Sequence, residues 1–359
     1  SARPLLALLA GLLLASCGLP PPTGRSASVA LPLPTARETL IGRALGPELA
    51  AHPGLSGIHL LAHPHDAFAA RVLLARAAER TLDVQYYIWR GDITGTLLLA
   101  ELLAAAERGV RVRLLLDDLG TAGLDAPLAT LNGHPNVEVR LFNPFTLRRP
   151  KVLGYLAAPR RANRRMHNKS FTADNQASIV GGRNVGDEYF GATQGVLFAD
   201  LDVLAAGPVV PEVSSDFDRY WASASAHPAE RILPAVVPGA LAELATQAQA
   251  LLHSPGASDF ARAIAASDFT RQLLEHTLPL HWARVRMLSD DPAKALGQAH
   301  RADLLLRQLG AALGQPKHSV EVVSPYFVPT AAGVAAFARL RQAGVRVRVL
   351  TNAFEATDV

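Results

Sequence analysis

The sequence predicts an α/β protein built from two similar repeats, the second of them incomplete. Residues 82–116 show a strand–helix–strand pattern, and residues 320–350 show the same order again. Both copies contain Gly-Val-Arg-Val-Arg, at positions that lie 235 residues apart in a chain of 359. Because strands that alternate with helices form layered sheets, we expect two α/β/α repeats with mixed, mostly parallel sheets.

The first copy begins with a strand over residues 82–88, which are rich in β-branched and aromatic side chains. Thr94 is a candidate N-cap for a helix whose apolar pattern covers residues 97–108. Residues 110–116 form the next strand, which closes on Asp117 and Asp118. These elements make up one β-α-β unit.

The second copy has the same order of elements, at strand 320–323, helix 331–342 and strand 344–350. Between the copies, we expect helices that pack around the junction, at about residues 239–254, 258–276 and 293–313. The predicted organisation is therefore a first repeat over residues 56–235, then linker helices and the start of a second repeat over residues 236–359.

The N-terminal residues have the pattern of a targeting signal. Leu5–Ala15 is an apolar run well short of the roughly 20 residues that a spanning helix needs. It ends in Leu-Ala-Ser-Cys-Gly, which resembles the lipobox of bacterial lipoproteins, in which the cysteine is lipidated. We therefore expect a signal peptide over residues 1–17, a lipid anchor on Cys17 and a cell-envelope location, on the periplasmic face of the outer membrane. The alternative is a chance match.

Residues 18–55 are rich in Pro, Gly, Ser and Thr, which predicts a flexible tether. Cys17 is the single cysteine of the chain, which excludes intramolecular disulfides and cysteine-based zinc clusters. Apolar residues make up 49% of the chain and charged residues 18%, which excludes general disorder.

The formal net charge is only +4, yet basic residues gather in one stretch without any acidic residue. Such a stretch suits a phosphate-bearing partner, and the alternative is a solvated basic loop. Its members are Arg148, Arg149, Lys151, Arg160, Arg161, Arg164 and Arg165.

Residues 166–184 carry the candidate chemistry. Side chains alternate on an extended segment, so His167 and Lys169 share one face while Asn168 faces the other way. A nucleophile or base and a cation then converge on one point. Residues 173–175 (Ala-Asp-Asn) form a turn between two short strands.

Two glycines and an asparagine follow this hairpin. Gly181 and Gly182 permit close backbone approach, and Asn184 stands at a predicted helix N-terminus that favours an anion. Lysine is rare in this chain, which has only Lys151, Lys169, Lys294 and Lys317. An imidazole, an ammonium, a carboxamide and a helix end together indicate a phosphate site.

The pattern His-x-Lys-x4-Asp-x6-Gly-Gly-x-Asn resembles the signature of the phospholipase D superfamily. The resemblance implies that His167 attacks phosphorus to form a phosphohistidine, and that Lys169 and Asn184 hold the phosphoryl oxygens. Asp174 matches the aspartate of the motif, and Gly182 matches its second glycine. Because Asp174 lies in a turn, we expect it to secure the local structure.

The resemblance continues over most of residues 60–359 and favours the cardiolipin synthase C type branch of the superfamily. It also implies that an acidic residue ahead of a Gly-Pro pair orients the nucleophilic histidine. Asp200 lies at the matching distance from Gly207-Pro208, and Asp202 is the second candidate. The segments that carry the wider resemblance are residues 83–89, 142–145, 186–190, 198–203, 207–208, 324–329 and 351–352.

The superfamily uses two such motifs, and only one occurs here. Val110 precedes His167 by 57 residues, so the equivalent of His167 in the second copy is expected near position 402, beyond Val359. We therefore expect a fragment that carries half of a two-motif site and is inactive alone. The alternative is a homodimer that shares two single motifs.

The resemblance implies a phosphatidyltransferase that acts on anionic phospholipids such as phosphatidylglycerol at a membrane surface, without a metal or other cofactor. Phospholipase D hydrolysis is one alternative. A nuclease or phosphodiesterase is another, which the basic stretch favours but the lipid anchor and the low aromatic content of 6% oppose. A third alternative is a lipoprotein that binds anionic headgroups without turnover.

Overall fold

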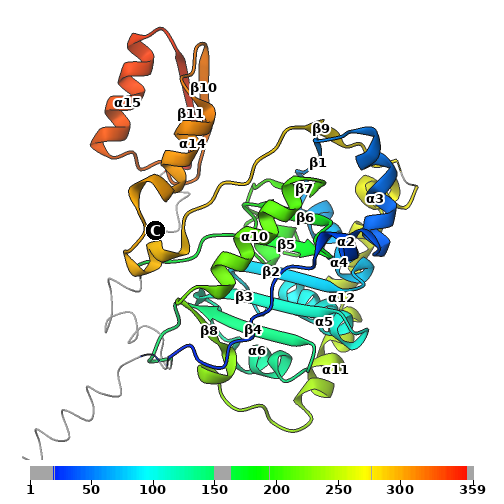
Figure 1. Cartoon of the computed structure of the whole chain (residues 1–359). Helices are drawn as coiled ribbons and strands as arrows, with labels where there is room; N and C mark the ends of the chain where they lie inside the picture. The colour runs from blue at the N-terminus through cyan, green and yellow to red at the C-terminus, as the bar shows by residue number, and fades with distance from the viewer. Residues whose placement is uncertain (1–18, 20, 149–162, 194, 276, 354–359) are drawn as a thin grey trace, which may run out of the picture. The chain divides into compact units, whose positions relative to one another are not determined.

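A nine-stranded mixed sheet forms the centre of the first of two structural units, Ser1–Ala299 and His300–Val359 (Figure 1). The computed structural model describes residues 19, 21–148, 163–193, 195–275 and 277–353. The predicted signal peptide and Cys17 lie outside the described residues. The strand order is β8-β4-β3-β2-β5-β6-β7-β1-β9. The bounds are β1 (Ser56–Leu61), β2 (Thr81–Ile88), β3 (Arg111–Gly120), β4 (Val137–Phe142), β5 (Ser170–Ala173), β6 (Ala177–Gly181), β7 (Asp202–Ala206), β8 (Ala226–Pro228) and β9 (His281–Ala283).

The strand directions confirm a mixed sheet but correct the prediction of mostly parallel strands. β3 runs parallel to β2 and to β4, whereas the other neighbouring pairs in this sheet are antiparallel. Parallel strands need a long crossover, such as the helix that links β2 to β3. β5 and β6 are joined by a tight turn instead, which permits only an antiparallel pair.

Helices cover both faces of the sheet. α4 (Pro64–Ala77), α5 (Ile93–Glu107) and α6 (Asp125–Asn132) lie on one face and α10 (Val209–Ala222) on the other (Figure 1). The shorter or more peripheral helices of this unit are α2 (Leu33–Arg37), α3 (Leu40–Ala51), α9 (Asp187–Phe190), η1 (Ala229–Arg231), α11 (Ala240–Leu252), α12 (Pro255–Ala265), α13 (Asp268–Leu274) and η2 (Pro292–Leu296).

Side chains of β2 point alternately to the two faces of the sheet, which explains why helices pack on both faces. Its apolar side chains Leu82, Val84 and Tyr86 belong to the largest buried hydrophobic cluster, with residues of α4 and α5. Asp83 and Gln85 alternate with them and point to the α10 side, where Asp83 meets Arg113 and Gln85 meets Met166. β2 is therefore buried on both faces.

The predicted β-α-β unit is confirmed, with one correction at the start of its helix. α5 begins at Ile93, and its N-cap is Asp92, which accepts a hydrogen bond from Gly95 N at 3.0 Å. Thr94 is not the cap because it already lies in the first turn, where its N–H donates to Asp187 Oδ1 at 2.8 Å. Gly109 follows the helix with φ of 93°, a conformation that glycine adopts without steric cost.

Helices also form near the three predicted linker patterns. α11 and α12 pack against α5 and α4, so they belong to the first unit and the boundary between the units falls at residue 299. The predicted helix 258–276 is two helices, because Ser267 caps a new helix by accepting from Thr270 N at 3.2 Å. The third pattern divides in the same way, into η2, η3 (Arg301–Asp303) and α14 (Leu305–Leu313).

The second unit contains the start of the predicted second copy. It holds β10 (Ser319–Val323), α15 (Ala331–Gln342) and β11 (Arg346–Leu350), and the two strands pair in parallel. The order and direction match β2, α5 and β3 of the first unit. The repeat predicted from Gly-Val-Arg-Val-Arg is therefore present as a structural repeat.

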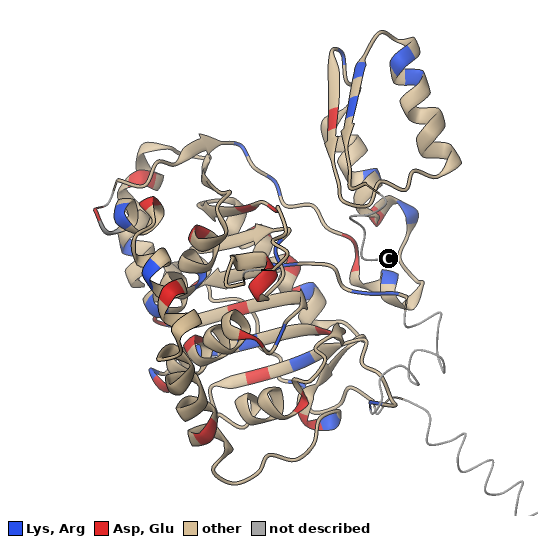
Figure 2. Ribbon diagram, turned by 180° about the vertical axis from the view of Figure 1, so that it is seen from behind, with Lys and Arg blue, Asp and Glu red and all other residues tan. Residues whose placement is uncertain are grey.

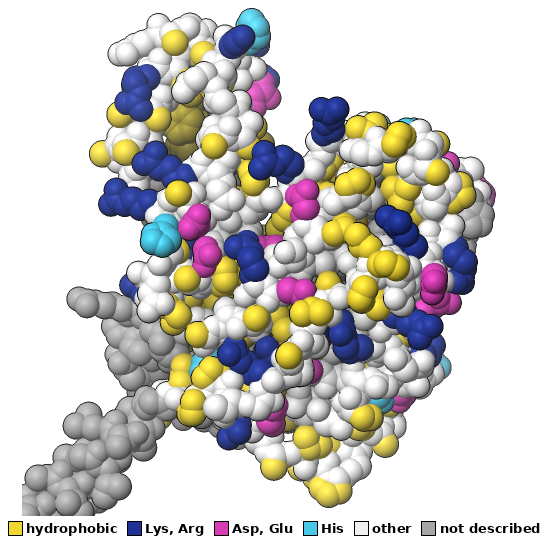
Figure 3. Space-filling model, in the orientation of Figure 1, with side chains coloured by type: hydrophobic (Ala, Val, Ile, Leu, Met, Phe, Trp, Pro, Cys, Tyr) yellow, Lys and Arg dark blue, Asp and Glu magenta, His cyan; other side chains and the backbone are white. Residues whose placement is uncertain are grey.

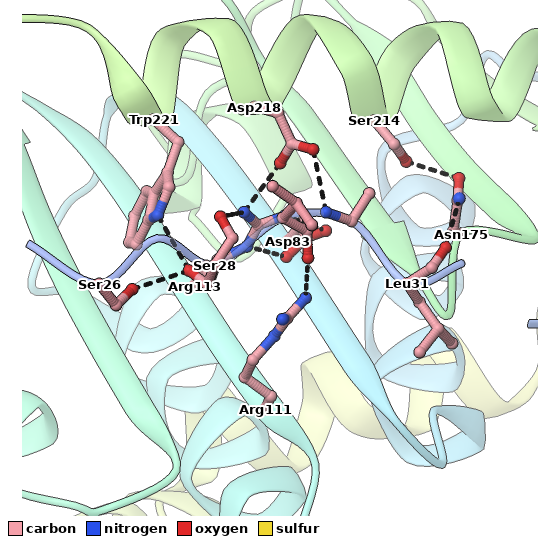
Figure 4. Close-up of polar contacts among 12 residues, drawn as sticks. Ser26, Ser28, Leu31, Asp83, Arg111, Arg113, Asn175, Ser214, Asp218 and Trp221 are labelled. Carbon is pink, nitrogen blue, oxygen red and sulfur yellow. Dashed lines mark hydrogen bonds and ion pairs between the residues drawn. The ribbon is translucent and has the colours of Figure 1, made fainter. Parts of the chain in front are cut away.

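The predicted tether over residues 18–55 is wrong for most of its length. Residues 33–37 and 40–51 are helical, and residues 25–31 lie extended between α10 and the sheet (Figure 4). Buried arginines hold this N-terminal segment. Arg113 donates to the backbone carbonyl of Ser28 and Arg140 to that of Ser26, both at 2.8 Å.

The N-terminal segment satisfies side chains that would otherwise be buried without partners. Trp221 Nε1 donates to Ser28 Oγ at 3.2 Å, and Ala30 N donates to Asp218 Oδ2 at 2.9 Å. At the end of the segment, Asn175 Nδ2 donates to the carbonyl of Leu31 at 2.8 Å. Composition could not predict this order, because the partners come from distant strands and from α10.

The turn between β5 and β6 has the predicted position. Asp174 and Asn175 both have φ of 51°, and Gln176 N donates to Ala173 O at 3.0 Å, which is the geometry of a type I′ hairpin. The buried carboxylate of Asp174 accepts hydrogen bonds from the N–H groups of residues 79–81, at 2.8 to 2.9 Å. Asp174 therefore ties the turn to the start of β2.

We expect Asp174→Ala to lower the free energy of unfolding by about 3 kcal/mol, because three backbone donors lose their acceptor. Asp174→Asn should cost about 1 kcal/mol, since Oδ1 alone accepts two of the three bonds and asparagine tolerates positive φ. Urea unfolding of both variants measures the difference. Equal losses would show that the bonds to residues 79–81 contribute little.

Candidate functional site

The predicted motif lies at the edge of the sheet where β2, β3 and β6 end and β5 and β7 begin. Ser170 pairs with Gln85, so the residues just before β5 lie beside the carboxyl end of β2. The carboxyl ends of strands are the usual place for ligands in open α/β sheets. The fold thus puts His167 and Lys169 where a substrate can reach them.

His167 and Lys169 lie together, as the alternation of side chains predicted. Lys169 Nζ is 3.2 Å from His167 Nδ1, and it also donates to the backbone carbonyl of His167 at 2.8 Å. Asn168 faces away, and its Nδ2 donates to Asp216 Oδ2 at 3.3 Å. A candidate nucleophile and a candidate cation thus converge on one point.

Desolvation by the surrounding protein governs the protonation of both side chains, of which Lys169 is buried and His167 remains accessible at the surface. Burial, and then the neighbouring charge of Lys169, lower the pKa of His167 to about 4. Burial also lowers the pKa of Lys169 to about 8, although the charges of Asp200 and Asp202 act in the opposite direction. Near neutral pH the imidazole is therefore neutral and the ammonium remains charged.

Tyr87 is a member of the site that the sequence did not identify. Its ring centroid lies 4.7 Å from that of His167, and Lys169 Nζ lies 5.6 Å from the ring of Tyr87. Burial raises the pKa of Tyr87, so the phenol stays neutral. The sequence signal was present, because Tyr87 follows the buried Tyr86 and alternation turns it to the other face.

Asp200 and Asp202 flank the two glycines of the motif. A Cβ atom on Gly182 would overlap the carboxylate of Asp200, and one on Gly181 would overlap that of Asp202. Both glycines are thus needed for close approach, as predicted. Asp200 accepts from Leu201 N at 2.8 Å, and burial raises its pKa.

Asp200 was expected to orient His167, yet no hydrogen bond joins these two described residues. The charge of Asp200 acts on Lys169 instead. Asp202 is fully buried, where it accepts from Arg71 at 2.8 Å and from Arg183 N at 3.1 Å. It therefore ties β7 to α4 and to the glycine corner, which makes it a structural residue.

Asn184 is buried and bonds within the protein. Its Oδ1 accepts from Ile88 N and its Nδ2 donates to Tyr189 Oη, both at 3.0 Å. It does not begin a helix as predicted, because α9 starts at Asp187 and its first turn is acidic. Asn184 thus joins the end of β2 to α9, and its predicted contact with a phosphate stays a prediction.

At each end of the basic stretch, an arginine that the structure describes forms ion pairs with aspartates. Arg148 pairs with Asp118 at 2.8 Å and with Asp125 at 2.5 Å, and Arg165 pairs with Asp117 at 3.1 Å. Residues 149–162, with four of the predicted basic side chains, lie outside the described residues. Arg148 and Arg165 are therefore neutralised by carboxylates, and for the rest of the stretch the basic field stays a prediction. Elsewhere on the described ribbon, basic and acidic residues are interspersed (Figure 2).

Comparisons with known proteins agree with this geometry. A family model described as "Cardiolipin synthase, PLD-like domain" matches residues 73–221. The chain is 49% identical over 319 residues to cardiolipin synthase C of Escherichia coli K12, a match that covers 89% of this chain and 67% of that protein. It is 33% identical over 325 residues to an uncharacterized protein of Helicobacter pylori J99, covering 89% and 64% respectively.

The chain therefore spans about two thirds of the length of these curated relatives. Among solved structures, phosphatidylserine synthase of Haemophilus influenzae matches with a TM-score of 0.53 and 13% identity, over 87% of this chain and 65% of that chain. This likeness concerns the fold alone. The family model and the 49% identity show that the chain belongs to the cardiolipin synthase C type of the phospholipase D superfamily, a family of phosphatidyltransferases and phosphodiesterases.

Proposed function

We propose that the protein is a phosphatidyltransferase that forms cardiolipin through a phosphohistidine on His167. The observation that carries this proposal is the neutral imidazole of His167 beside the charged ammonium of Lys169, with 3.2 Å between the two nitrogens. A neutral imidazole has an electron pair for attack, and an ammonium stabilises the negative charge on phosphoryl oxygens.

The reaction would take place in two displacements at phosphorus. A nitrogen of His167 forms a bond to phosphorus while the bond to the headgroup oxygen of phosphatidylglycerol breaks, and glycerol leaves with a proton. The hydroxyl of a second phosphatidylglycerol then attacks, loses its proton and releases the imidazole. The family resemblance assigns these proton transfers to a histidine of a second motif.

Exposed apolar side chains near Asp200 support a lipid substrate. Val196, Leu197 and Leu201 are each about half exposed or more. Hydrophobic side chains also reach the surface between charged ones on the face shown in Figure 3. None of the described helices is long and apolar enough to cross a membrane. Apolar surface beside a polar site suits a substrate that has both acyl chains and a phosphate.

His167→Ala should lower turnover at least about 10⁴-fold, because it removes the attacking atom. Full-length protein is mixed with phosphatidylglycerol vesicles, and cardiolipin, phosphatidic acid and glycerol are measured by mass spectrometry. Asn168→Ala is the matched control and should stay within about 3-fold of wild type, since Asn168 faces away. Trapping the acid-labile phosphoryl group on another residue would refute the role of His167.

The products also separate the alternative activities. Cardiolipin as the main product supports transfer, whereas phosphatidic acid alone would indicate phospholipase D hydrolysis. Cleavage of an oligonucleotide without lipid turnover would indicate a nuclease.

Lys169→Arg should lower turnover about 100-fold or more despite its equal charge. The compact ammonium of Lys169 contacts both the imidazole and the backbone of His167, and a longer planar guanidinium cannot occupy that position. The measurement is kcat with phosphatidylglycerol, with the midpoint of thermal unfolding as the control for folding. Activity within a few-fold of wild type would show that only the charge at position 169 matters.

The two perturbed pKa values predict how activity depends on pH. We expect kcat/KM to fall below about pH 4, where His167 takes up a proton, and above about pH 8, where Lys169 loses one. Activity is measured between pH 3.5 and 9.5 in buffers that keep the vesicles intact, at roughly two readings per unit. Burial raises the pKa of the Asp117 carboxyl, which accepts from the backbone N–H of Met166, to about 7, so an acid limb near that pH is attributed to Asp117 if Asp117→Asn removes it. An acid limb near pH 6.5, the ordinary pKa of histidine, that persists in Asp117→Asn would contradict the desolvation of His167.

A further inference from the structure

Two adjacent buried aspartates at the end of β3 hold the chain on either side of the basic stretch. Asp117 and Asp118 are both fully buried. Asp118 Oδ2 accepts from Phe145 N at 2.7 Å and from Arg148 at 2.8 Å, where the stretch begins. Asp117 holds the end of the stretch, immediately before His167.

The contacts of Asp117 are directed at the backbone that carries His167. Its Oδ2 accepts from Met166 N at 2.9 Å, and its Oδ1 accepts from Arg165 Nη1 at 3.1 Å and from Leu119 N at 3.0 Å. Met166 is itself buried in a hydrophobic cluster, so the residue before His167 is fixed by its N–H and by its side chain. Little freedom remains for the next residue.

A second route connects Asp117 to the same histidine. After burial, the charge of Asp117 is the next cause that raises the pKa of Tyr87. The ring of Tyr87 packs against the imidazole of His167. The carboxylate therefore acts on His167 through the backbone, and its charge also acts on the ring neighbour of His167.

We propose that Asp117 is a positioning residue that holds His167 in place for attack on phosphorus, a role that rests on the proposed function. Asp117 acts through the backbone, because it accepts from the N–H of Met166 and so sets the chain from which His167 projects. A displacement of about 1 Å at a reacting atom costs up to about 100-fold in rate, so this restraint matters for turnover.

The arrangement of donors makes the two aspartates differ in a testable way. In Asp117→Asn the amide oxygen can replace only one carboxylate oxygen. We expect it to take the Oδ1 position, where it accepts from two donors, because the Oδ2 position offers only one. The NH₂ group then faces the N–H of Met166, donor against donor. In Asp118→Asn the oxygen at the Oδ2 position keeps the bonds to both Phe145 and Arg148, and the NH₂ group at the Oδ1 position faces the hydroxyl of Thr121, which can accept from it.

We expect Asp117→Asn to lower kcat for phosphatidyl transfer about 100-fold with KM within about 2-fold, and Asp118→Asn to lower it less than about 5-fold. Both are made in the full-length protein and assayed on phosphatidylglycerol vesicles. Asp83→Asn is the control for stability, because Asp83 is an equally buried partner of an arginine, far in sequence from the motif. It should lower the unfolding midpoint without a comparable loss of kcat.

Hydrogen exchange of the Met166 amide gives a readout that does not need turnover. Asp117→Asn should speed this exchange at least about 10-fold, and Asp118→Asn and Asp83→Asn should not. Unchanged exchange, or equal kcat losses in Asp117→Asn and Asp83→Asn at equal stability, would overturn the positioning role. If the three variants show this exchange pattern but the wild-type protein forms no phosphohistidine, the restraint stands and the proposed function fails.

Arg165→Gln covers the case in which Asp117→Asn does not fold. It removes the buried ion pair with Asp117, which should lower the midpoint of thermal unfolding, and leaves the bond to Met166 N, so kcat of the folded protein should stay within about 5-fold of wild type. A loss as large as that of His167→Ala would assign the restraint to Arg165 and overturn the role of Asp117.

Discussion

The site depends on one electrostatic constraint, which is that an imidazole and an ammonium 3.2 Å apart cannot both be protonated at low cost. Burial disfavours the charged form of each, and their mutual repulsion adds to the effect on His167. Lys169 keeps its proton because lysine starts from the higher pKa and because the charges of Asp200 and Asp202 act to raise that pKa. In water at about pH 5 both the imidazole and the amine would be protonated, and neither could act as a nucleophile.

Buried arginine–carboxylate contacts join the strands of the sheet that carries this pair. Arg71 binds Asp202 at the start of β7, and Arg113 binds Asp83 in the middle of β2. Breaking such a pair leaves an uncompensated buried charge, at a cost of about 3–5 kcal/mol. The N-terminal segment adds to the second of these contacts, because the carbonyl of Ser28 accepts from Arg113 Nη1, which also pairs with Asp218 (Figure 4). Residues far from the motif thus stabilise the sheet on which the motif lies.

Local periodicity accounts for what the sequence predicted well. The strands around α5, the turn at Asp174 and the shared face of His167 and Lys169 each depend on neighbours within a few residues, and the structure has them as predicted. The antiparallel majority of the sheet, the ordered N-terminal segment and the internal bonding of Asn184 depend on partners that only the fold brings together. No spacing in the sequence indicates that Tyr189 accepts from Asn184.

The tautomer of His167 connects the observed geometry to the proposed attack. Lys169 faces Nδ1, so a neutral imidazole that accepts from this ammonium carries its proton on Nε2 and keeps no electron pair there. Attack through Nε2 requires the proton on Nδ1, together with an acceptor for it. A bound phosphodiester would compete for the ammonium and release Nδ1, which could then carry the ring proton while Nε2 gives its own proton up and gains the electron pair for attack. On this view the contact with Lys169 keeps Nε2 of the histidine unreactive until a phosphodiester competes for the ammonium.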